Sequence, residues 1–181
     1  IETLANDEDT VKGIPLMGVN PQENSLVALD DSVYLTTSNV WNSTDLSLSR
    51  IEGINSGDYA VTQVLNATDI ADNTAATIKA SAIVSAEQGY FYASQSDENW
   101  NTVSVIYQFN PTTGVITESN VAGTGTEDIA FIGLDNANYL WVSVANPSTP
   151  GVDVIDTKTN TKYIDRLLTE LNPSTIRFIE E

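Results

Sequence analysis

The sequence contains no cysteine and no histidine. These absences exclude a disulfide, a thiolate nucleophile and a Cys/His zinc site within this chain. They also exclude a catalytic triad that depends on an imidazole. The lack of cysteine does not assign a compartment, because an exported bacterial protein and a cytosolic protein are both compatible with it. Any chemistry must therefore come from oxygen and nitrogen groups other than imidazole.

Basic residues are scarce as well. Seven Lys and Arg stand against 25 Asp and Glu, which gives a net charge of -18. Nucleic-acid binding rests on clustered Lys and Arg, so this balance argues against a nucleic-acid partner. It disfavours anionic membrane surfaces for the same reason. The surplus of carboxylates predicts a charged surface that keeps the protein soluble. Calcium affinity is the alternative, because hard cations prefer oxygen ligands.

Long hydrophobic runs are also missing. No apolar run approaches the roughly 20 residues that cross a bilayer, and no signal-peptide pattern opens the sequence. Hydrophobic residues make up 41% and charged residues 18% of the 181 positions, which predicts one globular domain with a real core. Because the first residue is Ile1, we expect a processed product, a fragment or an excised piece.

One pattern occurs three times in the chain. Each copy has an apolar segment, a short polar turn and a strand that carries an aromatic residue, and the copies begin at Ser25, Ser81 and Ile129. The aromatic residues at the equivalent position are Tyr34, Tyr92 and Trp141. A third and a fourth strand follow in each copy. The turns between them, at 55–57, 110–114 and 156–160, open with Asn or Asp and close with Gly or Asn, which tolerate the backbone of a tight turn.

Four antiparallel strands in a unit of about 45 to 55 residues match the period of a propeller blade. A β-sandwich also has many short strands, but it does not repeat the same hairpin at this spacing. We therefore predict an all-β fold: a partial or split β-propeller of about three four-stranded blades plus one strand of a flanking blade at each end. The predicted divisions are 1–19 for the outer strand of a preceding blade, 20–66, 67–120 and 121–168 for the blades, and 169–181 for the first strand of a following blade.

The terminal strands are expected at 10–17 and 175–179, since Asn-Pro pairs precede both the first blade and the last strand. Open apolar edges invite pairing with another chain. A second chain or a missing N-terminal segment is therefore expected to complete the ring.

The third unit carries a family resemblance. Val152-Asp-Val-Ile-Asp-Thr-Lys-Thr-Asn-Thr-Lys, followed by Leu171-Asn-Pro-Ser-Thr-Ile, resembles the repeats of bacterial and archaeal propellers of the YVTN type. The second unit matches fairly at Phe109-Asn-Pro-Thr-Thr-Gly, the first is degenerate, and the usual glycine before Pro173 is absent. The resemblance covers roughly residues 14–181. It implies an exported protein, in an extracellular, cell-surface or periplasmic location, that often acts as a binding module, and it transfers no catalytic residue.

The loops after the second strand of each unit, at 38–45, 95–101 and 146–150, are predicted to open onto one face. Loops on a rigid scaffold usually carry function. Two of them place a tryptophan beside Asn and Asp, a combination that suits a carbohydrate or protein partner. The predicted binding residues are Trp41, Asn42, Asp45, Asp97, Glu98, Trp100 and Asn101. The alternative is that the two tryptophans cover their own loops.

Two acidic clusters are weaker candidates for a metal site. Asp7 and Asp9 belong to an acidic stretch near the N-terminus that lacks the spacing and central glycine of an EF-hand, so a solvated loop is the competing interpretation. Glu127 and Asp128 precede the innermost strand of the third unit, close to the predicted channel entrance. Paired carboxylates there also suggest acid/base catalysis, although such a pair alone is a weak signal.

The sequence thus predicts a binding or assembly module that is not an enzyme and recognises a protein or carbohydrate through loops on one face. No cofactor is predicted, apart from the alternative of calcium. One alternative function is a lactonase-like propeller hydrolase with calcium in the central channel. Another is a structural subunit whose open edges join neighbouring chains.

Overall fold

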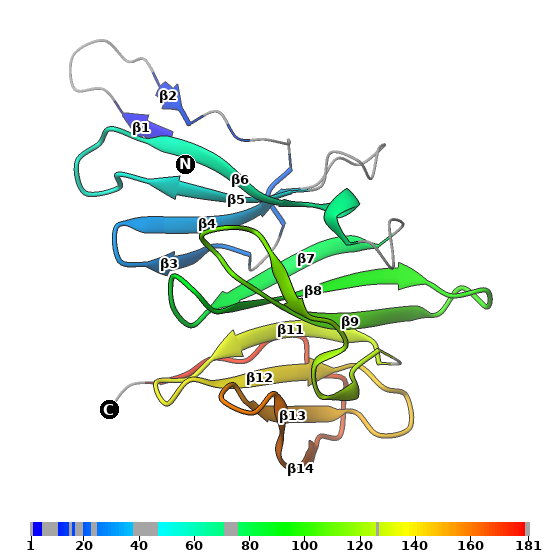
Figure 1. Ribbon diagram of the computed structural model, residues 1–181. Coiled ribbons are helices and arrows are strands. Elements are labelled where there is room, and N and C mark those ends of the chain that lie inside the picture. Colours follow the sequence, from blue (N-terminus) through cyan, green and yellow to red (C-terminus); the bar gives the residue numbers. More distant parts are fainter. Residues whose placement is uncertain are drawn as a thin grey trace.

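The computed structural model describes residues 2–4, 11–14, 16, 20–22, 25–37, 47–70, 76–125 and 127–179. Three four-stranded antiparallel sheets follow one another along the chain and lie one above the other (Figure 1). The first contains β3 (Val27–Leu29), β4 (Ser32–Thr37), β5 (Ser47–Glu52) and β6 (Ala60–Asn66). The second contains β7 (Thr77–Ile83), β8 (Gly89–Ser96), β9 (Thr102–Phe109) and β10 (Ile116–Glu118). The third contains β11 (Ile129–Leu134), β12 (Tyr139–Val144), β13 (Gly151–Asp156) and β14 (Thr161–Leu168).

Within each sheet every strand pairs only with its neighbours in sequence. The first strand of the second sheet, β7, lies next to β3 and β4 of the first sheet and β11 of the third. The first strands of the three sheets are therefore gathered at one side of the stack. The prediction of an all-β fold with three four-stranded antiparallel units is confirmed.

Short helical turns make two of the connections. The 3₁₀ turn η2 (Ala67–Asp69) follows β6, and η3 (Val121–Gly123) follows β10. At the start of η2 the Asn66 backbone N–H donates a hydrogen bond to the Asp69 carboxylate at 2.7 Å. In the described part of the chain, no helix has the length and apolar character needed to cross a membrane.

The turns form through the chemistry expected of them. Asn110 accepts hydrogen bonds from the backbone N–H groups of Thr112 and Thr113 at 2.9 Å each. Gly114 then closes this turn with a φ of 75°, a conformation that glycine adopts without strain. In the third sheet Asn160 closes the equivalent turn with a φ of 55°. These local signals explain why the strands begin and end where the sequence predicted them.

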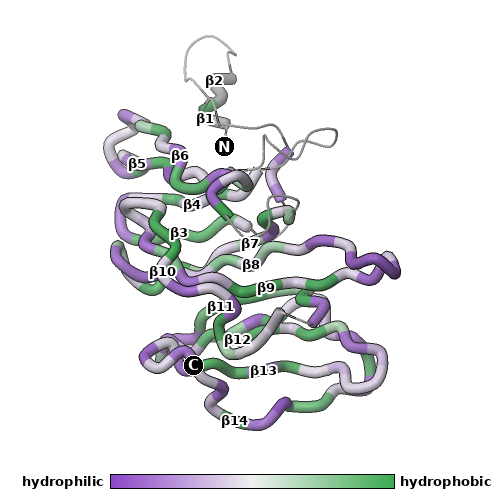
Figure 2. The backbone as a smooth tube through the Cα atoms, turned by 45° about the vertical axis from the view of Figure 1, so that its right-hand side comes forward, coloured by the Kyte–Doolittle hydropathy of each residue, from purple (hydrophilic) through white to green (hydrophobic). Residues whose placement is uncertain are grey.

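Two apolar clusters fill the spaces between the sheets. One joins the first and second sheets and contains Tyr34, Leu48, Ile78, Phe91 and Phe109. The other joins the second and third sheets, and its larger members are Tyr90, Tyr92, Ile106, Ile132, Leu140 and Ile155. Figure 2 shows the corresponding pattern, with apolar colour along the strands and polar colour at the tips of the turns. Burial of apolar area between stacked sheets stabilises the stack.

The repeated aromatic position has the same role in successive sheets. Tyr34 packs towards the second sheet, and Tyr92 packs towards the third. The equivalent Trp141 contacts the ring of Phe178, from the C-terminal segment, with 6.0 Å between centroids. In the first two sheets this aromatic position packs against the next sheet. In the third sheet it packs against the C-terminal segment instead.

The predicted C-terminal strand differs from the observed structure. Residues 175–179 belong to no strand, and residues 176–178 instead line the same hollow as β3, β7 and β11. Near the N-terminus, β2 (Val11–Gly13) covers part of the predicted strand at 10–17. It pairs with β1 (Glu2–Leu4) as a separate two-stranded hairpin and not with a neighbouring sheet. A strand therefore lies within the predicted range, and its place in a preceding blade stays a prediction.

Candidate functional site

The turn between β8 and β9 is organised around one carboxylate. Asp97 accepts hydrogen bonds from the backbone N–H groups of Asn99 and Asn101, both at 2.8 Å. It also accepts one from the side-chain amide of Asn101 at 3.1 Å. The hydrogen bond from this amide, together with those from the backbone, lowers the pKa of Asp97 below its ordinary value. The carboxylate is therefore ionised at neutral pH and fixes the shape of the turn.

Trp100 projects from this fixed turn into solvent. Its residue surface is 88% exposed, and its backbone has a φ of 64°, which is uncommon for a residue with a side chain. Glu98 is exposed beside it. The alternative that Trp100 covers its own loop is wrong, because an indole that covered the turn would be shielded from solvent.

The turn between β12 and β13 lies at the same end of the stack as the β8–β9 turn (Figure 1). Asn146 accepts hydrogen bonds from the backbone N–H groups of Ser148 at 2.8 Å and Thr149 at 3.1 Å. Two of the three loops that were expected on one face are therefore at one end. The third loop carries Trp41, Asn42 and Asp45, which lie outside the described residues, as do Asp7 and Asp9.

The two adjacent acidic residues at the start of the third sheet have different surroundings. Glu127 forms an ion pair with Arg166 at 2.8 Å and accepts a hydrogen bond from Asn146 at 3.3 Å. Arg166 also binds Asp153, whose side chain has no exposed surface. Glu127 therefore belongs to a charge cluster that supports the third sheet.

Asp128 forms no ion pair with a described residue. Burial raises the pKa of Asp128 above its ordinary value. Burial is the larger cause, and the charge of Asp128 the smaller one, that together raise the pKa of Tyr92 to about 12. Within the described ranges, no three or more Asp and Glu side chains come together in a group that could hold a metal ion. Asp128 is thus an isolated carboxyl group with a raised proton affinity.

Two adjoining hollows lie along the first strands of the three sheets. The larger, about 820 Å³, is lined from β3, β7 and β11 and by the C-terminal segment at 176–178. The smaller, about 380 Å³, is lined by Gln22, Lys79, Tyr92, Ala130, Ser174, Thr175 and Arg177. They share Gln22 and Arg177, and we call them together the first-strand cavity.

The sequence did not predict this cavity. Lys79 and Arg177 are nearly a hundred positions apart, and the C-terminal segment was expected to form a strand. One signal was available. Lys79 interrupts the strand Thr77–Ile83, which otherwise holds only small or apolar residues. A lone cation in such a strand is an unusual residue for a packed sheet.

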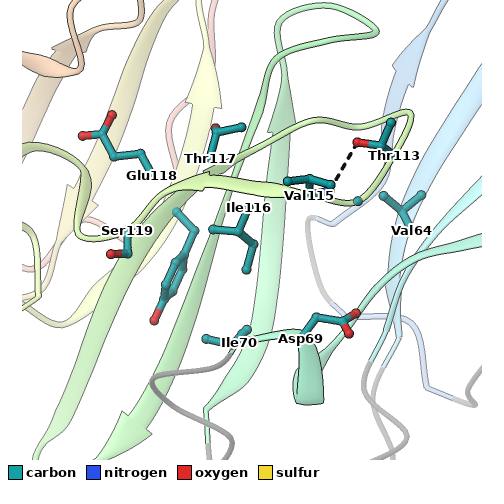
Figure 3. A pocket seen from close by; sticks show the side chains of 11 residues that line it. Val64, Asp69, Ile70, Thr113, Val115, Ile116, Thr117, Glu118 and Ser119 are labelled. Carbon is teal, nitrogen blue, oxygen red and sulfur yellow. Dashed lines mark hydrogen bonds between the residues drawn. The ribbon is translucent and has the colours of Figure 1, made fainter.

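A third hollow, about 620 Å³, lies between β10 and the end of the first sheet (Figure 3). Ile70, Ile116 and Tyr107 give it apolar surface, and Asp69 and Glu118 lie at its borders. Both carboxylates already have partners in the chain. Asp69 accepts the Asn66 backbone N–H at 2.7 Å, and Glu118 accepts a hydrogen bond from Asn160. This hollow therefore offers less chemistry than the first-strand cavity.

Neither a family model nor a curated protein sequence matches this chain. A solved structure of an exo-β-1,3-galactanase from Phanerochaete chrysosporium, determined with β-1,3-galactotriose, is similar in fold. The TM-score is 0.54 with 9% sequence identity, and the match covers 80% of this chain and 37% of the galactanase chain. The likeness concerns the arrangement of strands, and this chain matches well under half of the enzyme's length.

This finding corrects one prediction from the sequence. The chain was predicted not to be an enzyme, yet the solved structure with the similar fold is an enzyme that is named for its action on a carbohydrate. The arrangement of sheets therefore gives no ground for excluding catalysis. The lack of histidine and cysteine excludes only the mechanisms that require those side chains.

Proposed function

We propose that this protein recognises a carbohydrate at the end of the stack formed by the β8–β9 and β12–β13 turns, with Trp100 as the stacking platform. The observation that carries the proposal is the 88% exposed Trp100 on a turn fixed by Asp97. An isolated indole this exposed has no packing function in the sheet. Aromatic faces bury much area against the C–H faces of a sugar ring, while neighbouring amides orient its hydroxyls.

The rigidity of the turn favours binding. Hydrogen bonds to Asp97 hold Asn99 and Asn101 on either side of Trp100 before any ligand arrives. A preorganised surface loses less conformational entropy on binding than a mobile loop does. The fold likeness to a galactanase determined with a galactotriose supports a carbohydrate over a protein as the partner.

In the same proposal, the three sheets are blades of a β-propeller of the kind suggested by the YVTN-type resemblance. Their simple strand order and the gathering of β3, β7 and β11 at one side support this arrangement. The ring is completed by further sheets from the same protein or a second chain, and the protein works outside the cell or at its surface.

A second candidate function is glycoside cleavage, and Asp128 is the observation that favours it. A general acid must still hold its proton near neutral pH, and burial raises the pKa of Asp128 in that direction. Most glycosidases use a second carboxylate. Glu127 is neutralised by Arg166, so the second carboxylate comes from another part of the protein in this candidate.

The test is titration of the full chain with β-1,3-galactotriose and a panel of neutral oligosaccharides by calorimetry, with tryptophan fluorescence as a second readout. Trp100→Ala is expected to weaken binding at least tenfold with an unchanged melting temperature. Tyr59→Ala is the matched control, because Tyr59 is an exposed aromatic residue of the β5–β6 turn at the opposite end (Figure 1). Equal affinity of the Trp100→Ala variant and the wild type would refute the assignment. Release of reducing sugar that is lost in Asp128→Asn would support the second candidate.

A further inference from the structure

The positive charges of this chain are distributed unevenly. Six Lys and Arg residues have described side chains, and three of them, Arg50, Lys162 and Arg166, are held in ion pairs. Lys158 lies exposed in the β13–β14 turn. The remaining two, Lys79 and Arg177, line the same hollow of about 380 Å³. Among the described residues, neither one forms an ion pair.

The absence of a carboxylate from the described lining of this cavity is informative because carboxylates are abundant elsewhere. The chain has 25 Asp and Glu, yet no described Asp or Glu lines either part of the first-strand cavity. Cations placed together repel one another, and of these two Lys79 is half-buried while Arg177 is exposed. A chain of net charge -18 that places two cations in one hollow, with no carboxylate in its described lining, has a site suited to an anion from outside.

The rest of the cavity suits a ligand that carries hydroxyl groups. Gln22, Ser174 and Thr175 border the cationic part and supply amide and hydroxyl groups. The larger part adds apolar surface from Phe131, Leu134 and Phe178. Each part on its own, about 820 Å³ and about 380 Å³, falls in the size range of small-molecule sites, roughly 300 to 1,000 Å³. A polar, anionic end and a less polar face are the features of a sugar acid.

The cationic part of the cavity is also near one end of its strands. Lys79 is near the start of β7, and Ala130 is near the start of β11. β7 begins opposite the end of β8, since Thr77 pairs with Ser94. The cationic part of the cavity therefore lies towards the same end of the stack as the turn that carries Trp100.

We propose that the first-strand cavity binds the carboxylate of an acidic sugar, a uronic acid residue, between Lys79 and Arg177. This inference deepens the proposed function and rests on it for the sugar, while the anion site rests on the charges alone. Arg177 supplies planar donors that match a carboxylate in two parallel hydrogen bonds, and Lys79 supplies a compact charge. Trp100 then holds a neutral part of the same glycan.

The test compares three ligands by calorimetry with the full chain: a galacturonic acid oligosaccharide, the neutral galactose oligosaccharide of equal length, and inorganic phosphate. The wild type is expected to bind the acidic oligosaccharide at least tenfold more tightly than the neutral one. Lys79→Gln and Arg177→Gln are each expected to remove most of that difference and to leave neutral binding unchanged. Lys158→Gln removes an exposed charge outside the cavity and is the matched control. Melting temperatures verify that each variant is folded.

The outcomes separate the two proposals. Equal affinity for acidic and neutral sugars in the wild type, or an unchanged preference in both cavity variants, overturns the inference. Phosphate that binds as tightly as the uronic acid, and is lost in both variants, overturns the assignment to a sugar acid and leaves a site for small inorganic anions. Loss of acidic binding in the cavity variants, together with no effect of Trp100→Ala on any sugar, supports the cavity and refutes the Trp100 platform.

Discussion

Arg166 on β14 holds the carboxylate of Asp153 on β13 with two hydrogen bonds, from Nε at 2.9 Å and from Nη2 at 2.8 Å. The Asp153 side chain has no exposed surface. The pairing of β13 with β14 is irregular at this position, between Val152 and Val154, and again between Val154 and Ile155. Arg166 therefore neutralises a buried charge at the point where the sheet loses its regular ladder, and it reaches from there to Glu127 at 2.8 Å.

Removal of one partner from this pair is expected to be severe. Arg166→Met leaves Asp153 buried with only Lys162 nearby, and breaking such a pair costs about 3 to 5 kcal/mol. Urea unfolding followed by circular dichroism measures the loss. Glu52→Gln is the control, because the Arg50–Glu52 pair is more exposed and such pairs contribute only about 0 to 1 kcal/mol. Similar losses in the two variants would contradict the role of burial.

Acid should weaken the fold through the same residue. Burial acts to raise the pKa of Asp153, but hydrogen bonds and charges from Arg166 and Lys162 outweigh it and lower this pKa below its ordinary value. A lowered pKa in the folded state contributes stability that is complete above the unfolded pKa of about 3.9 and is lost as pH falls through the folded value. Unfolding free energies measured from pH 7 to pH 2 should fall below about pH 4. Asp153→Asn should reduce that fall.

Asp128 should have the opposite dependence. Burial raises its pKa in the folded state, so its contribution is complete below the unfolded pKa and is lost as pH rises through the folded value. At pH 7 the Asp128→Asn variant is therefore expected to be at least as stable as the wild type. At pH 3 this advantage should vanish. A variant that is destabilised equally at both pH values would instead indicate a lost hydrogen bond.

The second and third sheets are joined by a buried hydroxyl group. Tyr90 donates to Asn160 Oδ1 at 2.7 Å and lies 3.1 Å from the Thr157 carbonyl, while Gln88 donates to the Tyr90 oxygen at 2.8 Å. Tyr90→Phe removes the shared oxygen and leaves partners unsatisfied, which costs about 1 to 3 kcal/mol. Thermal unfolding measures this loss. Tyr59→Phe removes a hydroxyl from an exposed residue and should leave the melting temperature unchanged.

Two glycines allow backbone strain to be separated from crowding. Gly114 has a φ of 75°, and a Cβ there would lie 2.0 Å from the Val64 carbonyl oxygen. Gly57 has a φ of 81° with no atom within 4 Å of a Cβ. Gly57→Ala should cost only the left-handed strain, about 1 to 2 kcal/mol. Gly114→Ala should lower the free energy of unfolding, measured with urea, clearly more than Gly57→Ala does. Equal losses would show that β6 moves away from the new Cβ without loss of stability.

Much of the strand pattern could be predicted because its causes are local. The strand at Ile129–Leu134 and the start of the next at Tyr139 follow from an apolar segment and a turn of Asp and Asn. The charge cluster could not be predicted, since Asp153 and Arg166 meet only because of an irregular register. The placement of Lys79 and Arg177 around one hollow could not be predicted either, because it depends on where the C-terminal segment lies. The exposure of Trp100 could not be predicted from its sequence, which was equally compatible with a tryptophan that covers its own loop.

The strand order has a consequence for how the chain folds. Each sheet is made of consecutive strands, with no strand borrowed from another sheet. Every hydrogen-bonded ladder can therefore close soon after its residues are synthesised, before the next sheet exists. Proteins rich in such short-range pairings fold faster than those that depend on distant ones. During translation the first sheet would form with Tyr34 exposed to solvent until the second sheet packs against it. A ribosome stalled near residue 120 would hold this intermediate, in which the exposure of Tyr34 can be measured.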